Sequence, residues 1–254
     1  MAAFVDHPLV IFVVLFVLFV VAAAVGALVQ RRLVMLRDEE REDFNVVQGA
    51  TLTLLALLIG FSLSMAVGRY DTRKTLEENE ANAIGTEYAR ADLADAPVST
   101  QIKAGLVHYT QLRLAHFRTR DPEELARING DTAASQSELW QLATRVAKVN
   151  STPIGATIVT GMNDVLNSQD YSEAALINRI PLGTWILMIL IGLLGCAIQG
   201  YGAKGNLSRS FLITILPLTV ALSLALIADI DSPRGGIIHV QPQDLARLLH
   251  SLEK

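Results

Sequence analysis

The sequence predicts an all-α membrane protein with four transmembrane helices, two before and two after an inserted bundle of long helices. Of its 254 residues, 51% are hydrophobic and 18% are charged, whereas an average soluble domain is about 25% charged. The apolar residues fall in four blocks, each long enough to cross a bilayer. Between the second and third blocks lies a hydrophilic stretch whose apolar residues have the spacing of helices rather than strands.

Composition excludes several classes of function. Twenty-one Lys and Arg against 25 Asp and Glu leave a net charge of −4, which argues against binding of nucleic acid. The single cysteine, Cys196, excludes an intrachain disulfide and any site with several cysteine ligands. The five histidines have no metal-ligand spacing, and no Ser, Cys or His stands in a recognisable nucleophile motif. We therefore expect no metal, no cofactor and no enzyme activity.

The first span covers residues 9–29, which are 21 residues without a charge. At about 1.5 Å per residue, a helix of this length crosses the roughly 30 Å hydrocarbon core. No Lys or Arg precedes it, so we expect an uncleaved helix rather than a secretory signal peptide. The other spans are expected at residues 46–67, 181–200 and 210–228. The chain should thus divide into an N-terminal hairpin (1–67), a hydrophilic helical region (68–180), a C-terminal hairpin (181–228) and a tail (229–254).

The hydrophilic region is expected to contain three or four long helices. The first continues out of the second span to about Asp95, because Pro97 stops it. Ser99 is the expected N-cap of the next helix, which runs to about Arg118.

Two further helices are expected before the third span. Asp121 and Pro122 have the types expected at the N-cap and first position of a helix. Gly130-Asp131 is expected to interrupt that helix. A last helix should begin near Pro153 and reach Arg179.

Orientation is predicted from basic residues near the span ends, which favour the cytoplasmic side. Six stand in the two short loops, and five stand on the other side around much longer segments. The count places the short loops in the cytoplasm of a bacterial inner-membrane protein, with residues 68–180 and both termini outside the cytoplasm. The six residues are Arg31, Arg32, Arg37, Arg41, Lys204 and Arg209.

One face of the second span collects small residues at spacings of four, three, four and four. Small residues let helix backbones approach closely and are common where membrane helices pair. We expect this face to pack helices together and to support self-association. Its members are Gly49, Thr53, Ala56, Gly60 and Ser64.

The opposite face is polar at both ends and aliphatic in its middle. In a ring of subunits, such a face forms a pore whose apolar constriction gates by dewetting, and Arg69 attracts anions to one mouth. Alternatively, the polar side chains bond to neighbouring helices and the leucines face lipid. The face consists of Gln48, Thr51, Leu55, Leu58, Ile59, Ser62, Ala66 and Arg69.

Two groups of polar residues outside the spans are candidate binding sites. Glu80, Asn82 and Glu87 are candidates for the lining of a vestibule, but a shared site needs a second helix, and the alternative is a solvated helix face. After the fourth span, Asp229 and Asp231 precede a turn sequence. We expect these two to cap the membrane exit, because two carboxylates are too few ligands for a divalent cation.

Five short sequences, four at the ends of spans and one beyond the exit of the second span, occur together: residues 41–47 (REDFNVV), 69–71 (RYD), 80–85 (EANAIG), 178–181 (NRIP) and 229–235 (DIDSPRG). With them, essentially the whole chain resembles the bacterial bestrophin-like membrane domain family. The resemblance implies two pairs of membrane helices with a helical insert, and a distant likeness to bestrophin anion channels. Bestrophins keep their large central region in the cytoplasm, which is opposite to the orientation that the basic residues predict.

We expect the protein to associate with itself in the lipid bilayer and to form an ion-permeable pore, with inorganic anions as the expected ions. No span carries a charge in its central half, which argues against coupled transport. The alternative is a non-conducting, membrane-anchored module for interaction or sensing, or an accessory subunit of a larger membrane complex. A pore requires that the aliphatic middle of the second span face a common axis, whereas an anchor requires that it face lipid.

Overall fold

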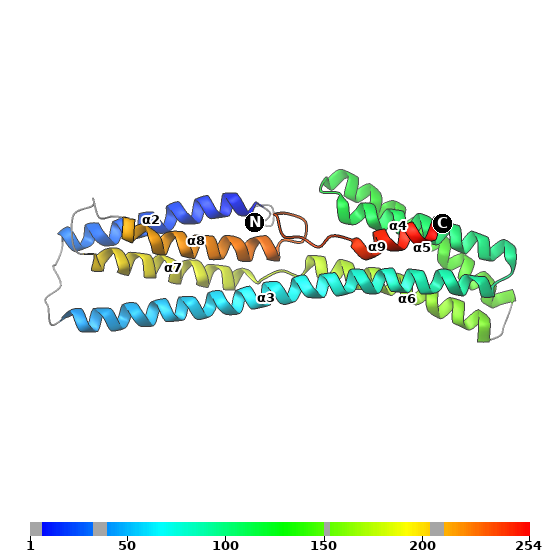
Figure 1. Cartoon of the computed structure of the whole chain (residues 1–254), viewed down its shortest axis with the longest axis horizontal. Coiled ribbons are helices and arrows are strands. Elements are labelled where there is room, and N and C mark those ends of the chain that lie inside the picture. Colours follow the sequence, from blue (N-terminus) through cyan, green and yellow to red (C-terminus); the bar gives the residue numbers. More distant parts are fainter. Residues whose placement is uncertain (1–6, 33–39, 150–152, 204–210) are drawn as a thin grey trace. The chain divides into compact units, whose positions relative to one another are not determined.

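The structure is a computed structural model that describes residues 7–32, 40–149, 153–203 and 211–254. Within these residues every regular element is a helix (Figure 1), and the all-helical membrane class expected from the sequence is confirmed. The helices are α2 (Pro8–Arg32), α3 (Glu40–Arg90), α4 (Ala96–Arg118), α5 (Pro122–Val149), α6 (Pro153–Ile177), α7 (Leu182–Gly202), α8 (Phe211–Asp231) and α9 (Gln243–Leu252), with a 3-10 helix, η1 (Ala91–Leu93), between α3 and α4.

The chain divides into two compact units, each built from segments far apart in the sequence. The membrane unit comprises Met1–Arg69 and Arg179–His239, and the helical unit comprises Tyr70–Asn178 and Val240–Lys254. The C-terminal segment that was expected only as a tail is shared between the units, and its last part forms α9.

Four helices are long and apolar enough to cross a membrane. Three of them, α2, α7 and α8, have 25, 21 and 21 residues, close to the roughly 20 that a bilayer requires. At 51 residues, α3 is much longer. Only its apolar part, residues 46–67, forms the span, because six charged side chains follow between Arg69 and Glu78 and charges are costly in hydrocarbon.

In the membrane unit, α2 packs against α7 and α8. Phe19 on α2 is completely enclosed. Further along, the backbones of α2 and α7 approach each other closely at Gly26 and Gly200. A Cβ on Gly26 would overlap the carbonyl of Ala197, and a Cβ on Gly200 would overlap that of Ala23. Glycine is needed at this crossing because any side chain would separate the two helices.

Replacement of Gly200 by alanine should lower the stability of the membrane unit by about 1–3 kcal/mol, the usual cost of forcing atoms into a packed site. The thermal unfolding midpoint of the purified protein in one detergent measures the loss. Gly183→Ala on the same helix is the matched control, since nothing lies within 4 Å of a Cβ there. Equal midpoints for the two variants would contradict the close approach of α2 and α7.

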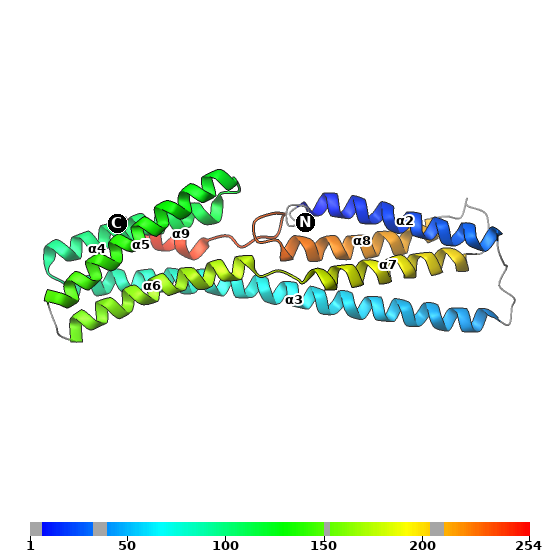
Figure 2. The same ribbon diagram turned by 180° about the vertical axis from the view of Figure 1, so that it is seen from behind.

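In the helical unit, α4, α5, α6, α9 and the second half of α3 enclose a hydrophobic core (Figure 2). The chain packs α4 against both α5 and α9, and α5 against α6. Residues of α4 enter this core at spacings of three and four, as in an amphipathic helix. Fully or almost fully buried members of the core include Ile84, Ile102, Leu106, Tyr109, Leu139, Ile158, Met162 and Leu245.

The start of α4 differs from the expected position. Ser99 is not an N-cap, because its backbone N–H donates to the carbonyl of Asp95 at 2.9 Å and the helix has already begun at Ala96. The expected cap of α5 is confirmed, since Oδ1 of Asp121 accepts the backbone N–H of Glu123 at 3.0 Å.

The interruption expected at Gly130-Asp131 is wrong, because α5 runs through both residues as one helix. A glycine inside a helix costs about 1 kcal/mol relative to alanine. The side chains of Ile128 and Thr132, on either side of this position, are buried against the rest of the unit. Tertiary packing therefore maintains the helix across a residue that is locally unfavourable.

Candidate pore face and buried charged groups

The small-residue face of α3 lies on the outside of the membrane unit. Gly49, Thr53, Ala56, Gly60 and Ser64 are all exposed. Nothing lies within 4 Å of a Cβ placed on Gly49 or Gly60. Within the described part of the protomer this face is thus uncovered, and it is open to lipid or to another copy of the chain.

The opposite face of α3, expected to line a pore, turns toward the protomer's own helices. Leu55 is 2% exposed and Ser62 is 1% exposed. Side-chain atoms of Thr51 and Leu55 lie 3.9 and 4.0 Å from a Cβ placed on Gly195 of α7. A side chain enclosed by its own protomer does not border a passage between protomers, so the pore assignment does not hold for Leu55 and Ser62. Ala66, a further member of the uncharged part of this face, is also fully buried, and the remaining four, Gln48, Thr51, Leu58 and Ile59, are half-buried.

Arg69, expected as a positive group at one mouth, is engaged in an ion pair. Its Nη1 lies 3.1 Å from Oδ1 of Asp231 at the end of α8, and the Asp231 side chain is 0% exposed. Asp231 also accepts the backbone N–H of Ile180, at 3.0 and 3.2 Å for its two oxygens. One buried carboxylate therefore joins the exit of α3, the segment before α7 and the end of α8.

Asp229 organises the turn that follows α8. Its two carboxylate oxygens accept the backbone N–H groups of Ile237 and Ile238, at 2.7 and 3.0 Å. Gly236 has a φ of 74°, and a Cβ there would overlap the Asp229 carboxylate, so glycine alone fits. These bonds agree with a cap at the membrane exit. Among the residues that the structure describes, no group of three or more His, Cys, Asp or Glu is placed to hold a metal ion.

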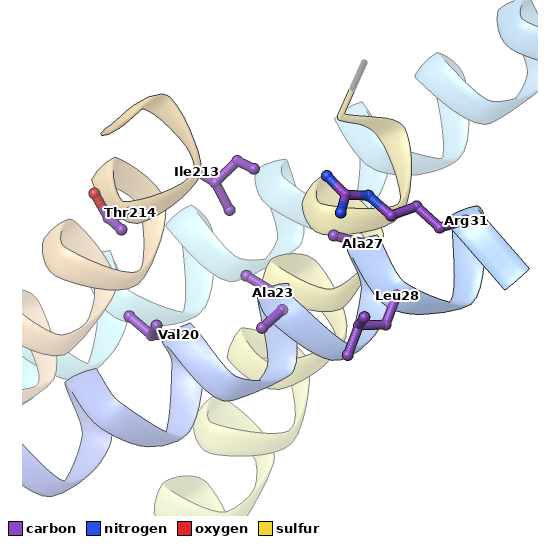
Figure 3. Close-up of a pocket in the computed structure, with 8 residues that line it drawn as sticks. Val20, Ala23, Ala27, Leu28, Arg31, Ile213 and Thr214 are labelled. Atoms are coloured by element: carbon purple, nitrogen blue, oxygen red, sulfur yellow. The ribbon is translucent and has the colours of Figure 1, made fainter. Parts of the chain in front are cut away.

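A small pocket opens between α2 and α8 (Figure 3). It has a volume of about 260 Å³ and an almost entirely apolar lining, with the short side chains of alanines leaving the space. Such a lining offers too few polar groups to replace the water around an ion. The pocket is therefore not a candidate for an ion path. Its lining residues are Val20, Ala23, Ala24, Ala27, Leu28, Arg31, Ile213 and Thr214.

In the helical unit, Arg113 of α4 is a buried charge that was not singled out from the sequence. Its side chain is 0% exposed, and its Nε donates to Oε1 of Glu80 at 2.5 Å while its Nη1 donates to Glu173 at 3.0 Å. Arg113 continues the buried series that contains Leu106 and Tyr109, at spacings of three and four. A charged residue at apolar spacing is the signal that would have found it.

The three vestibule candidates are not brought together. Glu80 and Glu87 are both fully buried. Asn82 is instead exposed, and it borders an open groove between α3 and α9 together with Arg90 and Arg247. The candidates thus lie on different faces of α3, and the described residues form no shared site from them.

Glu87 lies in the helical unit, about five helical turns beyond the span of α3. It is 0% exposed, and neither of its carboxylate oxygens has a hydrogen-bond partner in the described part of the chain. The carboxylate lies against Gly161 of α6, where a Cβ would overlap its Oε2. Burial raises the pKa of Glu87 to about 8, with Arg90 opposing the shift and Asp164 adding to it.

Glu87→Gln should make the stability of the helical unit less dependent on pH. The raised pKa means that the folded state holds this proton more tightly than the unfolded state does. The stabilisation from protonation is therefore lost as the pH rises from about 4.5 to about 8. Near pH 9 the variant should unfold at a higher temperature than the parent, and near pH 5 the two should agree.

Thermal unfolding scans at about pH 5, 7 and 9 measure this effect. Glu78→Gln is the matched control, because Glu78 is on the exposed side of the same helix. Parallel pH curves for the Glu87→Gln variant and the parent would show that Glu87 does not titrate in this range.

Both the sequence and the fold are similar to those of known proteins. The sequence matches the bestrophin-like domain family over residues 16–245, and no curated protein matches it. Three similar solved structures are crystal structures of a bacterial bestrophin homologue from Klebsiella pneumoniae, two of them single-substitution variants. Their identities to this chain are 14%, 13% and 16%, with TM-scores of 0.70, 0.68 and 0.66. The matches cover 95%, 94% and 95% of this chain, and 97%, 96% and 94% of those chains.

The family match begins inside α2 and ends in α9, so it includes most of the first candidate span, the other three spans and the helical insert between them. The solved structures share the fold over nearly the whole chain. The resemblance noted from the sequence is thus confirmed, and the chain belongs to the bestrophin-like family of membrane proteins.

Proposed function

We propose that this chain is a subunit of an oligomeric ion channel in the bacterial inner membrane and that the channel conducts inorganic anions. The family supports the proposal, because its name implies a likeness to bestrophin anion channels. The four apolar helices support a place in the lipid bilayer. The observation that carries the proposal is the uncovered face of the α3 span.

In the apolar part of α3 only 17% of the residues are buried within the protomer, against 39% in α8. The uncovered residues include the row of Gly, Ala, Ser and Thr described above. In a bilayer, such a row associates with other helices by close packing and by hydrogen bonds between hydroxyl groups and backbone. Copies of α3 arranged around an axis would cover it, which supports a homo-oligomer.

We place the apolar constriction of the pore at Leu57 and Phe61. They are 51% and 61% exposed, lie four residues apart on one side of α3, and adjoin the small-residue row. Rings of such side chains gate by dewetting. The hydroxyl groups of Thr53 and Ser64, on either side of them, supply polar surface for the mouths. Leu55, the centre of the constriction expected from the sequence, is enclosed by its own protomer.

Replacement of Leu57 and Phe61 together by alanine should widen and wet the constriction, so conductance should rise several-fold. Purified protein in planar bilayers under a chloride gradient gives the current, and the reversal potential should lie toward that of chloride. The control is the double alanine variant of Leu187 and Leu190 on α7, which are also exposed apolar residues and should leave the current unchanged.

The oligomeric state of each variant is measured in the same detergent before reconstitution. Absence of current from the parent and from the Leu57/Phe61 variant, with both folded and oligomeric, would contradict the channel proposal. The non-conducting, membrane-anchored module would then be the better account.

For orientation, we propose the arrangement that the family implies, with the helical unit and both termini in the cytoplasm. The basic residues predict the reverse by six against five, a margin of one residue. Three of the six, Arg37, Lys204 and Arg209, lie outside the described residues. Bestrophins keep their large central region in the cytoplasm, and the family match includes the whole of the corresponding region here.

Cysteine labelling in whole cells tests this orientation. An impermeant maleimide should modify Glu42→Cys at the start of α3 and leave Ser137→Cys in α5 unmodified, since both positions are exposed and only the first would face outward. The parent is the background control, because its single cysteine, Cys196, is buried. Labelling at Ser137→Cys with protection at Glu42→Cys would support the orientation that the basic residues predict.

A further inference from the structure

A buried carboxylate in the helical unit holds the start of the C-terminal helix. Glu77 of α3 is 1% exposed, and its Oε1 accepts the backbone N–H of Leu245 at 2.9 Å, in the first turn of α9. The first N–H groups of a helix have no hydrogen-bond acceptor within the helix. For the N–H of Leu245, the Glu77 carboxylate on α3 is this acceptor.

The helix α9 depends on docking for its own stability. It has 10 residues, and isolated helices shorter than about 12–15 residues are marginal in water. Leu245 is fully buried in the core of the helical unit. Leu248 meets α3 at Gly85, where a Cβ would lie 3.1 Å from its Cδ1. A change that weakens these few contacts therefore acts on the helix as a whole.

The nearest acidic groups make the charged form of Glu77 unfavourable. Asp244 stands on α9 directly before Leu245, and Glu80 lies on α3 three residues beyond Glu77. Burial raises the pKa of Glu77 to about 7. The backbone N–H groups of Leu245 and Asp244 oppose this shift, and the negative charges of the Asp244 and Glu80 side chains add to it.

The positive side chains nearby are engaged with other groups. Arg113 on α4 pairs with Glu80 and Glu173. Arg73, one turn before Glu77 on α3, donates to the backbone carbonyls of Ala175 and Asn178. These bonds direct the Arg73 guanidinium toward the end of α6 and the Arg113 guanidinium toward Glu80 and Glu173, rather than toward Glu77.

We propose that α9 is a proton-dependent latch controlled by Glu77. When Glu77 is protonated, its carbonyl oxygen holds the N–H of Leu245 and α9 stays docked on the helical unit. When Glu77 ionises, water stabilises the new charge only after α9 has moved away. Rising pH therefore releases α9 and uncovers the part of the core that Leu245 fills. The latch requires no ion conduction and so stands apart from the channel proposal.

Linkage gives the direction and the size of the effect. The docked state has the higher pKa, so it binds the proton more tightly and is favoured at low pH. If the pKa of Glu77 returns to its ordinary value of 4.5 when α9 leaves, the equilibrium constant for release is about tenfold larger at pH 8.5 than at pH 6.

Hydrogen–deuterium exchange of the full-length protein in detergent micelles measures this release. Exchange rates of the Leu248 and Leu249 amides, divided by their intrinsic rates at each pH, report how often α9 opens. Glu87→Gln serves as the background, so that the second buried carboxyl group does not titrate. In this Glu87→Gln protein, the opening of α9 should increase about tenfold from about pH 6 to about pH 8.5. The corrected exchange rates of amides in the middle of α5 should not show this increase.

Three variants separate the latch from a general loss of structure. Glu77→Gln keeps an oxygen that accepts the Leu245 N–H and cannot ionise, so opening should be rare and independent of pH. Glu78→Gln, at the exposed neighbouring position, should keep the tenfold change. Leu245→Ala should open α9 at every pH. The proposal is overturned if opening does not change with pH in the Glu87→Gln background, or if Glu77→Gln retains the change.

Discussion

The ion pair between Arg69 and Asp231 sets the rotation of α3 about its own axis within the membrane unit. Arg69 lies on the same side of this helix as Leu55 and Ser62. When the guanidinium reaches the buried carboxylate, these two side chains also point into the protomer, where they are enclosed. The small-residue face is then directed outward. Breaking a buried pair by removing one partner costs about 3–5 kcal/mol, and the partial exposure of Arg69 places this pair toward the lower end.

Small residues have two different uses in the membrane unit. At Gly26 and Gly200 they allow α2 and α7 to meet, backbone against backbone, inside one protomer. At Gly49 and Gly60 of α3 they leave a shallow surface that no described residue of the protomer fills. The physical principle is the same in both places, because the missing side chain permits close approach. Whether the approaching helix belongs to the same chain is decided by the packing of the other helices.

The buried carboxylates of the chain have hydrogen-bond partners to different degrees. At the exit of the membrane unit, Asp229 and Asp231 receive backbone N–H groups on both oxygens, and Asp231 has a guanidinium partner as well. In the helical unit, Glu80 has the Arg113 guanidinium as its partner, whereas Glu77 accepts backbone N–H groups and Glu87 has no hydrogen-bond donor within the described residues. An ionised carboxylate is costly in an apolar interior without such partners. The raised pKa values of Glu77 and Glu87, both in the helical unit, follow from this lack of compensating partners.

Local patterns in the sequence were sufficient for the four spans, the all-helical class and the cap at Asp121, because each depends on residues within a few turns of one another. They were insufficient for the orientation of α3. In a bilayer, apolar side chains suit lipid and protein neighbours equally, so periodicity did not show which face is enclosed. That was decided by the pairing of Arg69 with Asp231, which are 162 positions apart. The docking of α9 likewise depends on tertiary contacts. So short a helix is stabilised by the core and by Glu77 rather than by its own sequence.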